Sequence, residues 1–356
     1  MSMITPLLGS LQYLWRPSLR VAAHVPLRRA AHRPLRRAAH LPLRRAAHLP
    51  LLAATALLTA CAGVRGTGVT SIAPVTAQRV VASATGKTVP FAEMVTAASE
   101  ADVVFFGEQH DDAETHRAEL ALLTGIGERR QKVVLSLEMF ERDVQPLIDA
   151  YLAGGISEAD FRAQSRPWPN YESDYRPLLE LAKAKRWPVI AANVPRRLAS
   201  MVSRRGLAGV DSLSIDERRL VAVELQCPQD QYYRNFLEAM GGGHGAPASP
   251  HSESSANDGM MDRFYQAQCV KDETMAESIV AGRNAAGGDA IVVHFNGAFH
   301  SDYGLGTADR VRRRVAGVKT VVVSAVPVPD VVGVDAGEFL DRGGFVVLVR
   351  RVEGGR

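Results

Sequence analysis

Two short turns hold the residues best suited to chemistry in this chain. Gly107-Glu108-Gln109-His110 and Gly297-Ala298-Phe299-His300 each place a histidine three residues after a glycine, directly behind an apolar stretch. Glycine lets a chain turn sharply at the end of a strand, and imidazole can ligate a metal or haem iron or carry a proton near neutral pH. One such turn is a weak signal, because a lone histidine is more often simply hydrogen-bonded. Two copies predict one shared site.

Other polar residues also follow apolar stretches. Glu138 comes directly after 132–137, and Asn193 to Arg196 follow 188–192. Such apolar stretches separated by helices predict an α/β fold with a mainly parallel central sheet and helices on both faces. In these folds, sites form beyond the carboxyl ends of the strands. We therefore expect these residues to meet the two turns at one edge, where Glu108 and Glu138 would orient a histidine or bind a cation.

The periodicity of apolar residues gives the order of the elements. The expected strands are 102–106, 132–137, 188–192, 290–295 and 319–324, with 345–349 closing the sheet. The expected helices are 112–130, 141–153, 157–165, 175–185, one from 196, 215–226, 229–240 and 260–283. The helices between the third and fourth of these strands are expected to form a helical insertion. Residues 241–258, rich in glycine, serine, proline and alanine, are expected to form a mobile loop.

The first sixty residues are unlike the rest of the chain. Three near-identical copies of an eight-residue repeat carry most of their nine arginines, and an uncharged apolar run, Leu49 to Ala60, follows. A basic region before such a run is typical of a secretion signal. Leu58-Thr59-Ala60-Cys61 resembles the lipobox of bacterial lipoproteins, which implies cleavage before Cys61 and its lipidation. An ordinary signal peptide or an uncleaved anchor, with Cys61 incidental, is the alternative.

This interpretation divides the chain into a signal segment (1–60), a lipidated cysteine with a flexible tether (61–87) and an α/β domain (88–356). We expect a cell-envelope protein, held by lipid at the outer membrane and facing the periplasm. The +4 net charge becomes −5 when the nine arginines of the first segment are set aside, which predicts no nucleic-acid partner. Cys227 and Cys269 could pair in an oxidising compartment, but spacing alone leaves this open.

Five motifs occur in an order that resembles a known family. They are Phe106-Gly107-Glu108-Gln109-His110, Leu137-Glu138-Met139-Phe140, Ala192-Asn193-Val194-Pro195-Arg196-Arg197, Phe264-Tyr265-Gln266-Ala267-Gln268 and Phe295-Asn296-Gly297-Ala298-Phe299-His300. Across about 90–325 the chain looks like the ChaN-like haem-binding uptake lipoproteins of the Tiki superfamily. The resemblance implies a membrane-tethered protein that binds haem in iron uptake, more a binding protein than an enzyme, and a homodimer is a possible state.

The same superfamily supplies the alternative function. Other branches are metal-dependent proteases or esterases, which implies a hydrolase using a divalent first-row metal at His110 and His300 together with Glu108 and Glu138. No Gly-x-Ser-x-Gly elbow and no phosphate-binding Gly-x-x-x-x-Gly-Lys loop occurs in the sequence, so serine hydrolysis and nucleotide binding by those motifs are disfavoured.

Haem imposes physical requirements of its own. It needs an axial ligand, apolar or aromatic walls and cations for its propionates. The segment 166–176 contains Trp168, Tyr171 and Tyr175 with arginines and could form one lip of the site. Either tyrosine competes with His110 and His300 as ligand, unless these aromatic residues merely pack the loop against the sheet. Arg196 is a candidate partner for a propionate.

Overall fold

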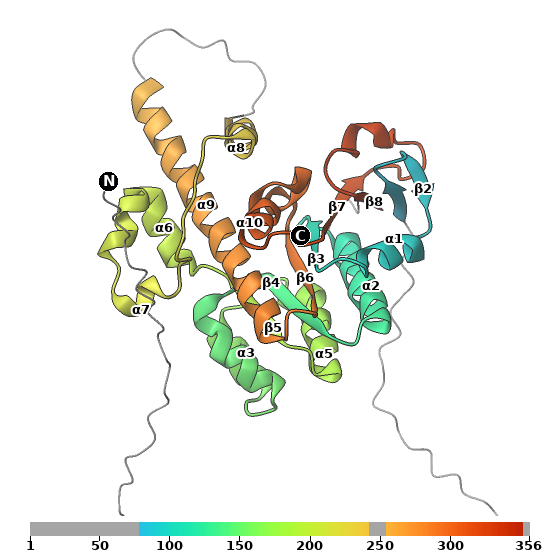
Figure 1. Cartoon of the computed structure of the whole chain (residues 1–356), viewed down its shortest axis with the longest axis horizontal. Coiled ribbons are helices and arrows are strands. Elements are labelled where there is room, and N and C mark those ends of the chain that lie inside the picture. The colour runs from blue at the N-terminus through green and yellow to red at the C-terminus, as the bar shows by residue number, and fades with distance from the viewer. Residues whose placement is uncertain (1–77, 242–253, 352–356) are drawn as a thin grey trace, which may run out of the picture. The chain divides into compact units, whose positions relative to one another are not determined.

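The computed structural model describes residues 78–241 and 254–351, which belong to one compact unit. Their centre is an eight-stranded sheet in the order β2-β1-β8-β7-β3-β6-β4-β5 (Figure 1). Strands β3 to β8 run parallel to one another, and β1 joins β8 antiparallel, which confirms the predicted fold class. The strands are β1 (Gln78–Ala82), β2 (Lys87–Val89), β3 (Val103–Glu108), β4 (Val133–Glu141), β5 (Val189–Asn193), β6 (Ile291–Gly297), β7 (Thr320–Val328) and β8 (Phe345–Arg350).

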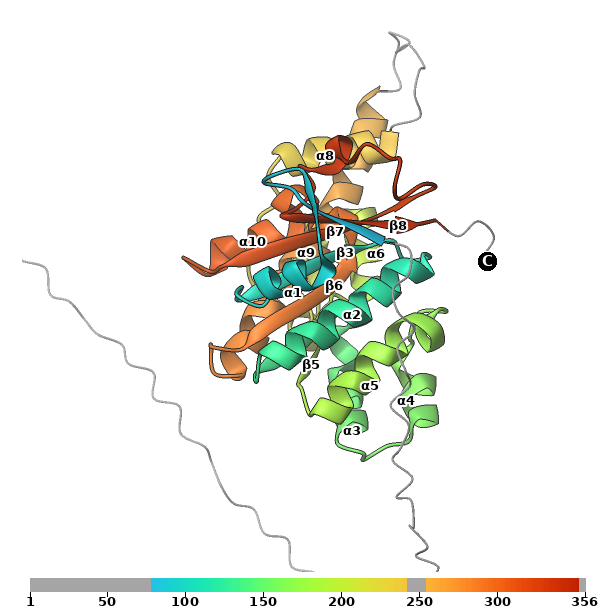
Figure 2. The ribbon, with the colours of Figure 1, turned by 90° about the vertical axis from the view of Figure 1, so that its right-hand side faces the viewer.

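Helices cover both faces of the sheet, as predicted (Figure 2). Alternate residues of a strand point to opposite faces, so Val104 and Phe106 of β3 pack into one apolar core and Val103 and Phe105 into another. The first core contains residues of α1 (Phe91–Ala98), α2 (Ala113–Arg129), α3 (Gln145–Leu152), α4 (Glu158–Ser165) and α5 (Arg176–Lys185). The second contains residues of α9 (Ser254–Ala285) and α10 (Gly306–Arg314).

The helical insertion lies between β5 and α9 and consists of α6 (Arg196–Arg205), α7 (Ile215–Arg218) and α8 (Gln231–Gly241). The predicted helix 215–226 is wrong beyond its first turn. Three backbone N–H groups in 222–226 donate instead to side chains of α9. Ala222 donates to Thr274, Val223 to Glu277 and Gln226 to Glu273. The polar face of a neighbouring helix therefore holds this segment in an irregular conformation.

Single helical turns connect several of these elements. They are η1 (Arg142–Val144), η2 (Tyr171–Tyr175), η3 (Leu207–Ser212), η4 (Ala298–His300), η5 (Asp302–Gly304) and η6 (Ala336–Phe339). Two of them carry predicted site residues, since η2 holds both candidate tyrosines and η4 ends at the second histidine.

The edge formed by β1 and β2 was not predicted. Residues 78–87 were expected in the tether, but Gln78–Ala82 pair with β8 and, in an antiparallel hairpin, with β2. Gln78 lies opposite Val349, near the carboxyl end of β8, so β1 begins at the carboxyl edge of the parallel strands. The partner strand is more than 260 residues away in sequence, so no local pattern could indicate the pairing. The signal segment and residues 61–77 lie outside the described residues.

The structure also locates part of the loop expected at 241–258 and the two cysteines Cys227 and Cys269. Residues 254–258 of the expected mobile loop belong to α9, and 242–253 lie outside the described residues. Cys227 and Cys269 form a disulfide with their Cα atoms 5.7 Å apart, which joins the segment before α8 to α9. In the described part of the chain, no helix has both the length and the apolar character needed to cross a bilayer.

Candidate functional site

The two Gly-x-x-His turns leave neighbouring strands at the same level. β3 and β6 are adjacent and parallel, and their register sets Gly107 opposite Asn296 and Glu108 opposite Gly297. The turns then pack backbone to backbone: a Cβ atom on Gly107 would lie 2.9 Å from the Cα atom of Ala298. Glycine is needed at 107 because of this close approach. The predicted convergence of the two turns is confirmed.

His110, the first of the two histidines, reaches the surface. Its Nδ1 lies 2.6 Å from Glu108 Oε1, which also accepts a hydrogen bond from the Tyr175 hydroxyl at 2.6 Å. The ring meets the edge of Trp168 with centroids 4.7 Å apart, and 48% of the side chain is exposed. An Nδ1–H that donates to the carboxylate leaves the lone pair on Nε2, and no described residue hydrogen-bonds to that nitrogen.

Gly297 in the second turn leaves room for the His110 ring because it has no side chain. A Cβ atom on Gly297 would come within 2.8 Å of His110 Nε2. Burial opposes protonation of His110, but the hydrogen bond that it donates to Glu108 and the charges of Glu138 and Glu108 raise the pKa of the imidazole above its ordinary value. A ligand on Nε2 would therefore compete with a proton.

His300 ends the second turn and is buried. Its Nδ1 lies 2.7 Å from Asp272 Oδ1 on α9 and its Nε2 lies 3.3 Å from Glu138 Oε1. Burial alone would lower the pKa of His300, but the charges of Glu138 and Asp272 raise it to about 9. The imidazole is therefore protonated at neutral pH and has no lone pair with which to ligate a metal or accept a proton.

Glu138 contacts both ends of the second turn. Its Oε2 accepts the backbone N–H of Gly297 at 2.8 Å, while its Oε1 faces His300. Burial penalises the carboxylate, yet the charge and hydrogen bond of His300 hold its pKa well below the ordinary value. Asp272, the other partner of His300, was not predicted. It lies inside a long amphipathic helix 28 residues before the histidine, where nothing in the local sequence distinguishes it.

The two tyrosines of the predicted lip point into the protein. Tyr171 packs against Phe140 and Phe161, and Tyr175 donates to Glu108, so both side chains are buried. Burial raises the pKa of both hydroxyls, and the charge of Glu108 raises that of Tyr175 further. A neutral hydroxyl inside the core is not available to haem iron in this structure.

Trp168 and Arg196 line one cavity, as a lip and a cation should. This Trp168 cavity has a volume of about 780 Å³ and lies between the segment 166–169, the start of α6 and the residues after β4. Arg166 and Arg197 also line it, but they pair with Glu141 and Asp143 and with Glu217. Arg196 is exposed and has no carboxylate partner in the described part of the chain.

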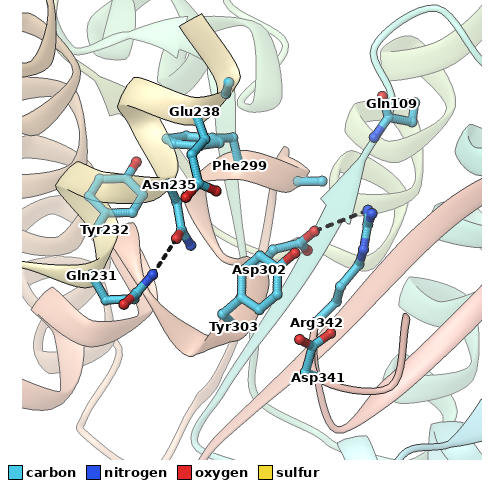
Figure 3. A pocket seen from close by; sticks show the side chains of 12 residues that line it. Gln109, Gln231, Tyr232, Asn235, Glu238, Phe299, Asp302, Tyr303, Asp341 and Arg342 are labelled. Atoms are coloured by element: carbon cyan, nitrogen blue, oxygen red, sulfur yellow. Dashed lines mark hydrogen bonds and ion pairs between the residues drawn. The ribbon is translucent and has the colours of Figure 1, made fainter. Parts of the chain in front are cut away.

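A second cavity, of about 690 Å³, flanks the turns on the side of α8 (Figure 3). Gln109 and Phe299 from the two turns line this Tyr303 cavity, together with Tyr303 and Arg342. Tyr303 is 45% exposed and has a φ of +62°, a backbone conformation that residues other than glycine rarely adopt. This residue was not predicted to belong to the site, although Asp302-Tyr303-Gly304 comes soon after the second turn.

The side-chain atoms that could together ligate a metal ion do not lie at the predicted pair His110 and His300. Within residues 78–241 and 254–351, one group of three His, Asp or Glu ligand atoms lies close enough to hold an ion: Glu108, His116 and Glu119. His110 and His300 are not members of that group. Among the described residues, His110 and His300 therefore do not form the three-ligand metal centre that the hydrolase alternative would need.

Comparison with known proteins places the chain in a family. The profile of the family described as "Haem-binding uptake, Tiki superfamily, ChaN" matches residues 94–311, which is more than half of the chain. A curated relative, the Arabidopsis thaliana protein RETICULATA-RELATED 5, chloroplastic, is 25% identical over 242 residues, or 64% of this chain. The match spans only 31% of the length of that plant protein.

A solved structure of a ChaN protein shares the fold. A structure titled as cofacial heme binding to ChaN of Campylobacter jejuni superposes with a TM-score of 0.55 at 15% identity, covering 77% of this chain and 98% of that one. An erythromycin esterase in its open conformation gives a TM-score of 0.39 at 15% identity, covering 74% and 80% of the two chains.

Proposed function

We propose, from the premise that the chain belongs to the ChaN family of haem-binding uptake proteins in the Tiki superfamily, that it is a membrane-tethered haem-binding lipoprotein serving haem or iron uptake. The geometry of His110 supports haem as the ligand best. This imidazole is half exposed, its Nδ1 is held by Glu108, and its Nε2 carries the lone pair. A histidine oriented through a carboxylate on its other nitrogen is the usual arrangement of a metal-ligating imidazole.

We place the macrocycle in the Trp168 cavity. Trp168 both lines this cavity and contacts the ring of His110, so it connects the proposed ligand to an aromatic wall. Arg196 supplies a cation that pairs with no carboxylate among the described residues and is therefore open to a haem propionate. A volume of about 780 Å³ lies within the range of pockets that bind molecules of this size.

Lipidation of Cys61 and a position at the outer membrane are part of the proposal. They are supported by the lipobox-like Leu58-Thr59-Ala60-Cys61 and the basic, then apolar, segment before it. A disulfide between Cys227 and Cys269 fits an oxidising envelope compartment.

Titration of the detergent-solubilised full chain with hemin tests haem binding. We expect a saturable Soret shift near an equimolar ratio. His110→Ala should weaken hemin binding at least about tenfold, because the ring and propionate contacts alone would remain. Arg196→Ala should weaken it roughly two- to fivefold, as expected for an exposed ion pair.

Matched variants control for the position of the haem. Arg197→Ala removes a neighbouring arginine that already pairs with Glu217, and it should leave the affinity unchanged. Tyr303→Phe removes the exposed hydroxyl of the other cavity and should also be neutral. A loss of binding in Tyr303→Phe with none in His110→Ala would assign the haem to the Tyr303 cavity. Absence of any saturable shift in the wild type would overturn haem binding altogether.

A further inference from the structure

Three buried side chains meet behind the first turn. Glu108 ends β3, while His116 and Glu119 lie three residues apart on α2 and face it. His116 Nδ1 is 2.8 Å from Glu119 Oε2 and 3.7 Å from Glu108 Oε2, and one ligand atom from each of the three residues lies within 4.8 Å of the others. The side chains are at most 3% exposed.

Each carboxylate keeps one oxygen without a hydrogen-bond partner. Glu108 Oε2 and Glu119 Oε1 are both inaccessible to solvent and accept no hydrogen bond from the residues that the structure describes. An unsatisfied buried charge is costly. Glu108 Oε2 faces His116 Nδ1, so this oxygen points into the group and not away from it.

Atoms of the group that face away from its centre are hydrogen-bonded to residues outside the group. His116 Nε2 lies 3.2 Å from the backbone oxygen of His110 and donates to it. Glu108 Oε1 accepts hydrogen bonds from Tyr175 and His110. Metal-binding residues are commonly held in this way, because hydrogen bonds on the far atoms fix the near atoms toward the ion.

We propose that Glu108, His116 and Glu119 bind one divalent first-row cation, Zn²⁺ or Mn²⁺. Two carboxylates and a neutral imidazole balance the charge of such an ion. The spacings of 2.8 and 3.7 Å bracket the roughly 3.3 Å that separates ligands in a tetrahedral site with bonds of about 2.0 Å. Imidazole nitrogen favours Zn²⁺ and carboxylate oxygen suits Mn²⁺. The site is distinct from the predicted pair His110 and His300, and it does not depend on haem binding.

Metal content after chelation tests the proposal on the full chain. The chain is unfolded without a reducing agent, refolded with Zn²⁺ or Mn²⁺ and dialysed against EDTA. EDTA then removes ions bound weakly to other histidines, those of the N-terminal repeat among them, whereas a buried ion is retained until unfolding. We expect about one ion per chain by elemental analysis and its release in guanidinium. A wild-type chain that retains none of either metal overturns the proposal.

Variants assign the ion to the three residues. Glu119→Gln keeps the size of the side chain and should retain less than about a tenth of an ion. Glu128→Gln makes the same change at an exposed position of α2 and should retain the wild-type amount. His116→Asn repeats the test if Glu119→Gln fails to give a folded circular-dichroism spectrum. Retention of the ion by either folded variant at the wild-type level places it elsewhere and contradicts the assignment.

Discussion

The two histidines share a motif but not an environment. His110 has one carboxylate partner and a surface position, whereas His300 is buried between Asp272 and Glu138. The first imidazole can offer a lone pair, and the second serves as a cation that joins α9 to β4. The motif predicts that the turns meet. It cannot predict this division, because Asp272 reaches His300 only through the packing of α9 against the sheet.

His300 should make the stability of the protein depend on pH. Its pKa is raised from 6.5 to about 9 on folding, so the stabilisation it provides is complete below pH 6.5 and is lost as pH rises through about 9. The loss should be on the order of 3 kcal/mol in the free energy of unfolding. Urea unfolding across this range measures it.

The variant His300→Gln serves as the control for that measurement. It cannot be protonated, so its free energy of unfolding should fall by about 3 kcal/mol less than that of the wild type over the same interval. The remaining decline, common to both proteins, comes from groups such as His116, whose pKa the charge of Glu119 raises to about 10 against the effect of burial. An equally steep decline in His300→Gln would show that another group is responsible.

At the scale of elements, the strands that hold the site could be predicted and those at the sheet edge could not. Valine-rich stretches indicate β3, β4 and β6, and the polar residues after them reveal the carboxyl edge. The β1–β2 hairpin lacks such a stretch and depends on pairing with β8, near the other end of the chain. The inward direction of Tyr171 and Tyr175 is equally unpredictable, since it follows from the single π-helical turn η2.

The contact between the two turns predicts a cost for Gly107→Ala. The added Cβ would meet the Cα atom of Ala298 at 2.9 Å, and backbone cannot move aside as a side-chain end can. We expect a loss of roughly 1–3 kcal/mol in unfolding free energy and weaker hemin binding through displacement of the turn that carries His110. Chemical denaturation and the hemin titration measure these two effects.

Gly344→Ala is the matched control for this overpacking. The nearest atom to its added Cβ is 3.7 Å away, an ordinary contact, so its stability should stay within about 0.5 kcal/mol of the wild type. A Gly107→Ala protein as stable as Gly344→Ala would mean that the turns are not packed as described.

At the scale of the whole molecule, the proposed tether depends on one sulfur atom. Cys61→Ser should abolish labelling with radioactive palmitate and move the protein from the detergent phase to the aqueous phase in Triton X-114 partitioning, because the acyl chains supply the membrane affinity. Ala62→Ser, a change of similar size beside the intact cysteine, should remain in the detergent phase. A Cys61→Ser chain that still partitions with detergent would indicate an uncleaved anchor.

The antiparallel pairing of β1 with β8 determines on which side of the domain a lipid tether would attach. Because Gln78 lies near the carboxyl end of β8, the chain enters the domain on the side where the two turns open. Sixteen residues separate Cys61 from Gln78, and they reach at most roughly 60 Å when fully extended. A lipid on Cys61 would thus hold the mouth of the site within roughly 60 Å of the membrane surface, which shortens the path through water of a hydrophobic macrocycle that leaves the lipid.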